Sequence, residues 1–259
     1  MLALKSHKLN AWLGGSPLRG VSPAIQVSNI AWEASDKPMA DANAGQPGRR
    51  RGVKREGLKI TIEFTLYEFA SVSARTAAVE AVNAWAKDGY LEISANPGRR
   101  VWVQCVQRAS VQEARDHHAA FTLVFETAEN PFWEDAEPVT HLLQGSTASA
   151  QITVPGAAEC VPAEVTVVPG TAVLNTLTLR LGDTAMSFSG LNVAAGDTLT
   201  LSHDPGDGRL VIACAAGSRY HCRSGDSADE LTAPPGSATL SFTANVMCDV
   251  TFSLRGRYL

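Results

Sequence analysis

The sequence lacks the features that mark a disulfide scaffold or a membrane-spanning protein. Its five cysteines are scattered and form no Cys-x-x-Cys pair, which argues against a disulfide framework or a cysteine metal site. We expect small buried thiols in a reducing cytoplasm, although Cys214 and Cys222 could face each other across a hairpin. No apolar run reaches the length of a membrane-spanning helix, and polar residues interrupt Met1–Trp12, so we predict neither a membrane span nor a signal peptide.

The short motifs of common enzyme families are also missing. The chain contains no His-Glu-x-x-His, no Gly-x-Ser-x-Gly, no phosphate-binding P-loop and no Gly-x-Gly-x-x-Gly before a helix. No pair of carboxylates and no Ser/His/Asp or Cys/His set suggests a shared active site. With a net charge of -4, the chain has no broad positive surface for nucleic acid. The sequence therefore predicts a non-enzymatic protein without a cofactor.

The composition is that of a folded protein with two domains. Hydrophobic residues make up 45% of the 259 residues and charged residues 19%, which is ordinary for a globular chain. After about residue 140 charge becomes sparse, and Thr, Ser, Val, Leu, Gly and Pro dominate. We predict an α+β domain over residues 1–140, mostly β with one helix, followed by an all-β sandwich over residues 141–259.

Periodicity places the main elements of the first domain. Apolar and polar residues alternate from Leu58 to Leu66, as in a strand with one face on a core. Ser73–Lys87 has helical spacing, with Ser71 or Ser73 as the N-cap and Gly89 as the left-handed residue after its end. A Pro-Gly turn then joins two further strands.

The second domain reads as a series of short strands separated by turns. Regular spacing of such strands, without any helical pattern, is typical of a sandwich. The expected strands are 151–154, 164–168, 175–181, 185–188, 198–202, 209–214, 239–246 and 249–254.

Two clusters could bind a metal, but each has a simpler explanation. Asp116-His117-His118 shows no third ligand nearby, so we favour a solvated turn. His203–Gly208 is rich in oxygen ligands, yet it lacks the carboxylate spacing of a calcium loop and suits a hairpin turn. We therefore predict no metal site.

A basic cluster in the first domain is the strongest candidate for an interface. Its members are Arg49, Arg50, Arg51, Lys54 and Arg55, within a Gly-rich stretch that precedes the alternating strand. We expect a projecting hairpin arm, which either is simply solvated or contacts DNA or an acidic partner surface.

Taken in order, several segments resemble distal tail proteins of siphophages. The helix followed by the Pro-Gly hairpin is one, and Ser189-Gly190-Leu191 with the Gly196-Asp197 turn is another. The segment Asn130, Pro131, Phe132 and Trp133 looks like the family's interdomain junction, and the closing strands up to Leu259 complete the likeness.

The resemblance implies a structural protein of the virion tail tip, assembled in the host bacterial cytoplasm. Its first domain is expected to form a homohexameric ring that joins the tail tube protein to the tail hub. DNA would pass through the channel without specific binding. The second domain is expected to be a galectin-like sandwich, and the basic arm to contact a neighbouring subunit or ring.

Two alternatives remain open from the sequence. One is a carbohydrate-binding adhesin that uses the sandwich to contact the host surface. Its difficulty is that no tryptophan follows Trp133, because sugar binding usually needs an aromatic platform. The other is a hydrolase with an accessory sandwich, for which the sequence offers no particular carboxylate.

Overall fold

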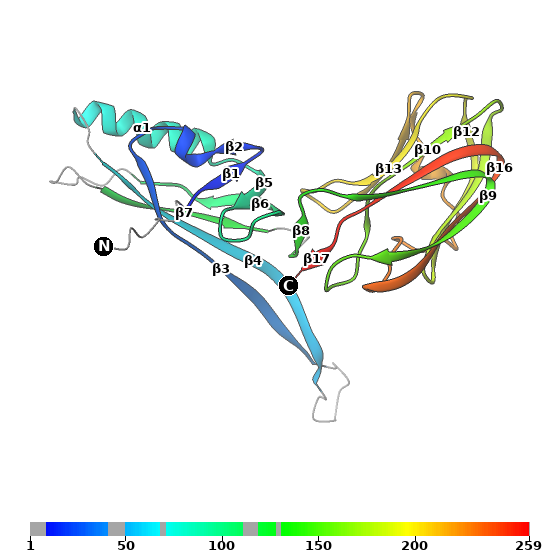
Figure 1. The fold of residues 1–259 in the computed structure, drawn as a ribbon, viewed down its shortest axis with the longest axis horizontal. Helices are drawn as coiled ribbons and strands as arrows, with labels where there is room; N and C mark the ends of the chain where they lie inside the picture. The colour runs from blue at the N-terminus through cyan, green and yellow to red at the C-terminus, as the bar shows by residue number, and fades with distance from the viewer. Residues whose placement is uncertain (1–8, 41–49, 68–70, 111–118, 128–130, 259) are drawn as a thin grey trace, which may run out of the picture. The chain divides into compact units, whose positions relative to one another are not determined.

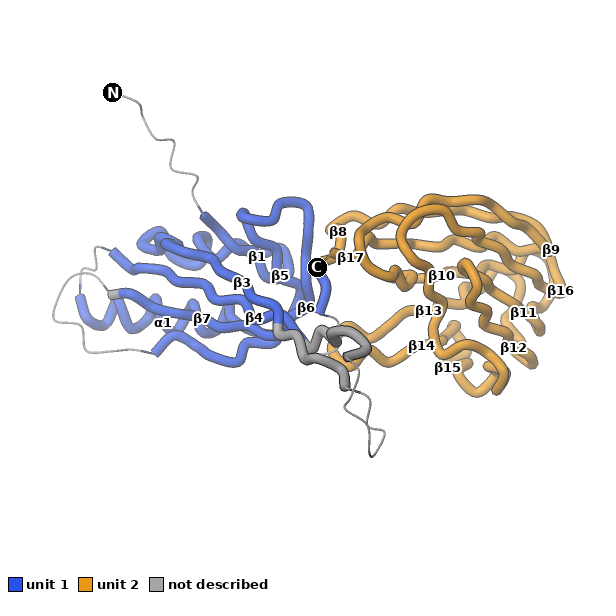
Figure 2. Tube along the Cα trace, turned by 90° about the horizontal axis from the view of Figure 1, so that it is seen from below, with its two compact units in different colours: residues 1–132 blue, residues 133–259 orange. Residues whose placement is uncertain are grey.

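The computed structural model divides the chain into two compact units, Met1–Phe132 and Trp133–Leu259 (Figures 1 and 2). It describes residues 9–40, 50–67, 71–110, 119–127 and 131–258. The boundary expected near residue 140 falls at the start of β9 (Val139–Val154), and the contacts divide the chain before this strand. The fall in charge after residue 140 coincides with β9, a Ser- and Thr-rich strand inside the second unit. The composition does not change at Phe132–Trp133, where the two units meet.

The first unit is built on one antiparallel sheet. Its strands lie in the order β2–β1–β5–β6–β7–β4–β3. Their bounds are β1 Ala11–Leu13, β2 Ser16–Pro17, β3 Ile25–Ala40, β4 Arg50–Leu66, β5 Gly89–Ile93, β6 Arg99–Gln107 and β7 Ala119–Glu126. The alternation that predicted a strand from Leu58 lies within β4, whose apolar residues from Leu58 to Leu66 are buried. The long β3–β4 hairpin extends well beyond the other strands of this unit (Figure 1).

One helix, α1 (Val72–Trp85), packs against this sheet, and one turn, η1 (Leu18–Gly20), precedes β3. The Ser71 hydroxyl accepts a hydrogen bond from Ala74 N at 3.1 Å, which confirms the predicted N-cap. Trp85 meets the Phe125 ring of β7 edge-on at 6.2 Å and donates its indole N–H to Ser16 O at 2.8 Å. The prediction for Gly89 is wrong, because the helix already ends at Trp85 and Gly89 opens β5.

The second unit is a β-sandwich in which β16 (Gly236–Leu254) belongs to both layers. Its first half pairs with β11 and its second half with β10, while β9 follows it on the other side almost throughout. The ladder breaks between Thr243 and Cys248, where the strand passes from one layer to the other. This break explains why the sequence suggested two strands in place of one. The other bounds are β8 Trp133–Asp135, β10 Pro162–Pro169, β11 Leu174–Leu181, β12 Thr184–Val193, β13 Leu199–His203, β14 Leu210–Cys214, β15 Gly217–Ser218, η2 Tyr220–Cys222 and β17 Arg257–Tyr258.

The core of the second unit comes from the inward faces of both layers. Phe242 and Phe252, one from each half of β16, are almost fully buried among Leu, Ile and Val side chains. Burying each such aromatic ring contributes about 1.5–3 kcal/mol relative to leaving it in water. The α+β unit, with one α-helix among its described residues, and the following β-sandwich confirm the fold class expected from the sequence.

Candidate assembly interface

The arm expected around the basic cluster is the outer part of the β3–β4 hairpin. β7 pairs with β4 from Lys59 to Leu66, and among the described residues the segment of β4 before Leu58 is paired with β3 alone. The structure places four residues of the cluster on this ribbon: Arg50, Arg51, Lys54 and Arg55. Arg49, the fifth, lies outside the described residues. A two-stranded ribbon with no third strand suits contact with another molecule, because its outer backbone groups need partners.

The arm is fixed at its root by Leu58 and Thr127. Leu58 N donates to the Thr127 hydroxyl at 2.8 Å, and Thr127 N donates to Leu58 O at 3.0 Å. Just beyond, Ser35 pairs with Gly57 and Asp36 with Arg55, so one extra residue of β4 forms a bulge. Bulges increase the local twist and bend of a strand pair. The ribbon therefore changes direction where it leaves the sheet.

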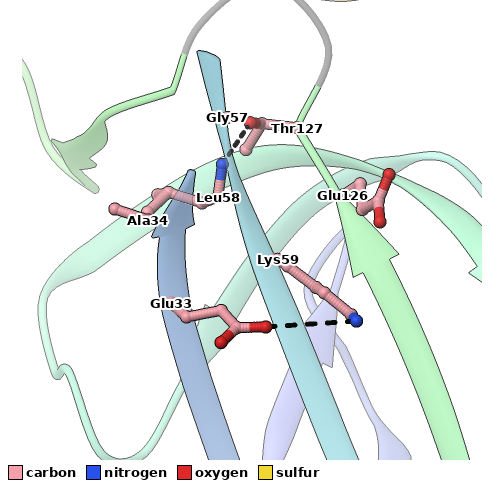
Figure 3. Close-up of a pocket in the computed structure, with 7 residues that line it drawn as sticks. All are labelled: Glu33, Ala34, Gly57, Leu58, Lys59, Glu126 and Thr127. Atoms are coloured by element: carbon pink, nitrogen blue, oxygen red, sulfur yellow. Dashed lines mark hydrogen bonds and ion pairs between the residues drawn. The ribbon is translucent and has the colours of Figure 1, made fainter. Parts of the chain in front are cut away.

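A groove of about 430 Å³ lies at this root (Figure 3). Its lining residues are Glu33, Ala34, Gly57, Leu58, Lys59, Glu126 and Thr127. Lys59 Nζ lies 4.0 Å from Glu33 Oε1, and both side chains are well exposed. Glu126 is also exposed and forms no ion pair or hydrogen bond with the part of the chain that the structure describes. Sequence reasoning missed this groove, because its residues come from three separate strand segments.

The predicted junction residues fall on both sides of the unit boundary. Pro131 is buried and Phe132 is the last residue of the first unit, whereas Asn130 lies outside the described residues. Trp133 is 1% exposed and opens β8. It pairs with Tyr258 of β17, so the first strand of the second unit lies beside its last. The role of these four residues as an interdomain junction stays a prediction.

A polar cluster ties β8 to the end of the chain. The Asp135 carboxylate accepts from Gly256 N at 3.0 Å and from the Tyr258 hydroxyl at 3.2 Å. Arg255 donates to the carbonyl oxygens of Asp135 and Ala136. Nearby, Arg257 Nε lies 3.4 Å from Glu134 Oε1, with both side chains largely buried. These contacts hold the two ends of the second unit together, so the polar cluster has a structural role.

Of the two clusters considered as metal ligands, the structure describes His203–Gly208. The His203–Gly208 segment is a turn: Asp204 accepts from Gly206 N at 2.8 Å, and Asp207 accepts from Arg209 N at 2.9 Å. Within the described ranges no three His, Cys, Asp or Glu side chains come together as metal ligands. Asp116-His117-His118 lies outside those ranges.

The five cysteines are free thiols, and Cys160, Cys222 and Cys248 are buried. Burial raises the pKa of Cys160 to about 11, so this thiol stays protonated at neutral pH. Cys214 and Cys222 form no disulfide. The prediction of unpaired, mostly buried thiols therefore agrees with the structure.

Exposed aromatic side chains are scarce in the second unit. Over residues 133–258, Tyr220 is the large aromatic residue with a substantially exposed side chain, at 49%. The Arg223 guanidinium lies 5.9 Å from its ring centroid, at the limit of a cation–π contact. One tyrosine partly engaged by an arginine is a small platform for a sugar ring.

None of the described helices is long and apolar enough to cross a membrane.

The fold of this chain is that of phage tail hub proteins. It superposes on the crystal structure of the Dit protein of phage SPP1, described as a paradigm of the hub adsorption apparatus in phages that infect Gram-positive bacteria, with a TM-score of 0.68 and 12% identity over 97% of this chain and 99% of that one. Two structures of the activated phage p2 baseplate, with Sr and with Ca, also match. Their TM-scores are 0.55 and 0.51 at 8% and 6% identity, covering 95% and 90% of this chain and 97% and 90% of theirs. No family model and no curated protein sequence matches the chain.

Proposed function

We propose that this protein is a non-enzymatic structural component of a phage or prophage tail tip, where it forms a ring that joins the tail tube to the tail hub or baseplate. The observation that carries the proposal is the two-unit fold, which is shared with the SPP1 hub protein along nearly the whole of both chains. A fold alone does not fix a function. The arm supplies the second line of support, because beyond its root the described strands pair only with each other and leave their outer backbone edges open to another molecule.

Ring formation needs two different surfaces on each copy. In a closed ring every subunit presents one patch to the copy ahead and another to the copy behind. The first unit has two unlike sides, since the long β3 lies at one edge of its sheet and the short β2 at the other. A homohexamer built from first units leaves a central channel, through which DNA passes without specific binding.

The first test is the mass of the purified protein in solution, measured by light scattering and paired with negative-stain images of the same peak. The proposal predicts a species six times the 27.4 kDa chain mass, or a stacked pair of such rings. Some rings close only on a template, so the same measurement is repeated with tail tube protein present. A protein that stays monomeric under both conditions would contradict the proposal.

A further inference from the structure

β9, the long edge strand of the second unit, has a pairing partner on one side only. β16 runs beside it from Val139 to Val154 (Figures 1 and 2), and no other described strand pairs with it. The structure records no backbone hydrogen bond between β9 and any other described segment. Because a strand directs its N–H and C=O groups alternately to its two sides, the outer groups of β9 are open to another chain.

Two other edges of the same sheet are protected. The segment that follows η2 covers the outer side of β12, where Ser224 N donates to Ser187 O at 2.8 Å. Ala228 N likewise donates to Ala185 O at 2.9 Å. β15, at the far end of the sheet, is only two residues long. Covering segments and short edge strands both prevent pairing with other chains, whereas β9 is 16 residues long and has no such cover in the described part of the chain.

β9 also lacks the residues that discourage strand pairing. It contains no Asp, Glu, Lys, Arg or Pro. Its second half, Thr147–Val154, pairs with β16 without a register shift. The outward residues of this half are exposed and polar, whereas the inward residues Ala148 and Ala150 pack against the core and stay only partly buried. The core of the second unit is therefore incompletely covered along this edge.

We propose that the second half of β9 pairs with the same segment of a second copy of this chain, antiparallel and with the two-fold axis at Ala150. This register places Ala148 opposite Ile152 of the second copy, and Ser149 opposite Gln151. The larger Ile152 then covers the smaller Ala148, and the outward pairs are uncharged. The contact is isologous, so it goes beyond the proposed function, whose ring contacts are heterologous.

The chemistry of the edge favours a second copy as its partner. Alternating N–H and C=O groups are matched by another extended backbone, as in strand addition to a sheet edge. Because the segment carries no charge, its own sequence lies opposite itself without repulsion. One short strand pair is small beside the interface of a stable complex, so two separate chains associate weakly. Covalent capture is therefore the suitable measurement.

The first test uses cysteine pairs in the full-length chain. Ser149→Cys/Gln151→Cys brings thiols opposite each other with Cα atoms about 4.5–5.5 Å apart, which suits a disulfide. Mild oxidation should then give a covalent dimer. Ser149→Cys alone should give about tenfold less dimer, because the two substituted positions then lie diagonally, about 7–8 Å apart. Mixing Ser149→Cys chains with Gln151→Cys chains should restore the link, and the original chain controls for its own free thiols.

The second test adds charge to the edge and follows amide hydrogen exchange in the second half of β9. In the original chain, protection of this segment should rise with protein concentration. Ser149→Lys/Gln151→Lys places like charges opposite each other and should abolish that rise, whereas Ser149→Lys/Gln151→Glu places opposite charges there and should keep it. Ser237→Lys/Thr243→Lys is the matched control, because it adds the same charge at exposed positions of β16, one strand inward.

Each result either supports or overturns the proposal. The disulfide in the double variant and in the mixture, together with the loss of protection in the double lysine variant, supports it. A ring that forms while no cysteine variant cross-links overturns it and leaves the proposed function standing. The disulfide in a chain that forms no ring supports it although the proposed function fails. Equal cross-linking by Ser149→Cys alone overturns the register. If the edge becomes protected only when tail tube or hub protein is added, its partner is another protein and the proposal is wrong.

Discussion

The molecule contains two long antiparallel strand pairs of similar length, and they differ in what lies beside them. β16 is flanked by β9 on one side and by β10 and β11 on the other, and its inward residues alternate as buried apolar positions. Among the described residues, β4 is flanked on both sides, by β3 and β7, from Lys59 to Leu66, and its segment before Leu58 pairs with β3 alone. A strand that keeps its apolar alternation stays within its own core. A strand that loses the alternation projects and remains available to another chain.

The largest effect on stability should come from a substitution in the β9–β16 pair, which has neighbouring strands along its length. Phe252→Ala removes a fully buried ring from the core of the second unit, and we expect the free energy of unfolding to fall by about 3–5 kcal/mol. Urea denaturation followed by tryptophan fluorescence and circular dichroism measures the change. Ser253→Ala, one residue along and facing outward, is the control and should change stability by less than about 0.5 kcal/mol. Equal effects from the two variants would break the comparison.

A smaller effect is expected where the ends of the second unit meet. Gly156 has φ of 102°, and a Cβ there would lie 2.5 Å from Arg257 N. Gly156→Ala should therefore strain or displace β17 and cost about 1–3 kcal/mol in unfolding free energy. Gly190→Ala separates backbone strain from the clash, since Gly190 has φ of 70° with nothing within 4 Å of its Cβ position. If both variants lose the same stability, the close approach to Arg257 contributes nothing.

The projecting part of the β3–β4 pair should contribute little to stability. Replacing residues 36–55 by a two-residue turn removes the ribbon beyond the root, whose described part pairs only within itself. We expect the unfolding free energy of the first unit to change by less than about 1 kcal/mol, because surface changes away from the core are nearly neutral. A loss of several kcal/mol in the same denaturation assay would mean that the arm is part of the fold.

The smallest effect is a pH dependence in the second unit. Burial lowers the pKa of His203 below its ordinary value of 6.5, and the Glu230 carboxylate 3.8 Å away opposes this only in part. The unfolded chain therefore binds this proton more readily than the folded chain. The stability associated with neutral His203 is complete above pH 6.5 and is lost as the pH falls from 6.5 toward the lowered pKa. Denaturation at pH 7.5 and 5.5 should show a smaller pH difference in His203→Gln than in the original chain.

The sequence was sufficient for elements whose signal is local. The alternation from Leu58, the Ser71 cap and the Pro-Gly hairpin each predict a feature that the structure contains. The outer arm was harder, because Asp36–Ala40 and Arg50–Gly57 do not alternate and read as a Gly-rich loop with a hairpin at most. The continuity of β16 was hidden by the irregular step at Thr243–Cys248.

The groove could not be predicted, since it depends on strand register. Glu33, Lys59 and Glu126 are far apart along the chain, and each alone reads as an ordinary solvated charge. Only the pairing of β3 with β4 and of β4 with β7 brings them into one row. The basic cluster was visible because its residues lie close together in the sequence, whereas the groove is assembled by the fold.

The most direct test of the account compares the intact chain with the variant that lacks residues 36–55, by light scattering in the same buffer. The account predicts a ring-sized assembly for the intact 27.4 kDa chain and a monomer, lighter than 27.4 kDa, for the shortened one, with both equally resistant to urea. If the shortened chain assembles to the same number of copies as the intact chain, the arm does not build the ring, and the central claim is wrong.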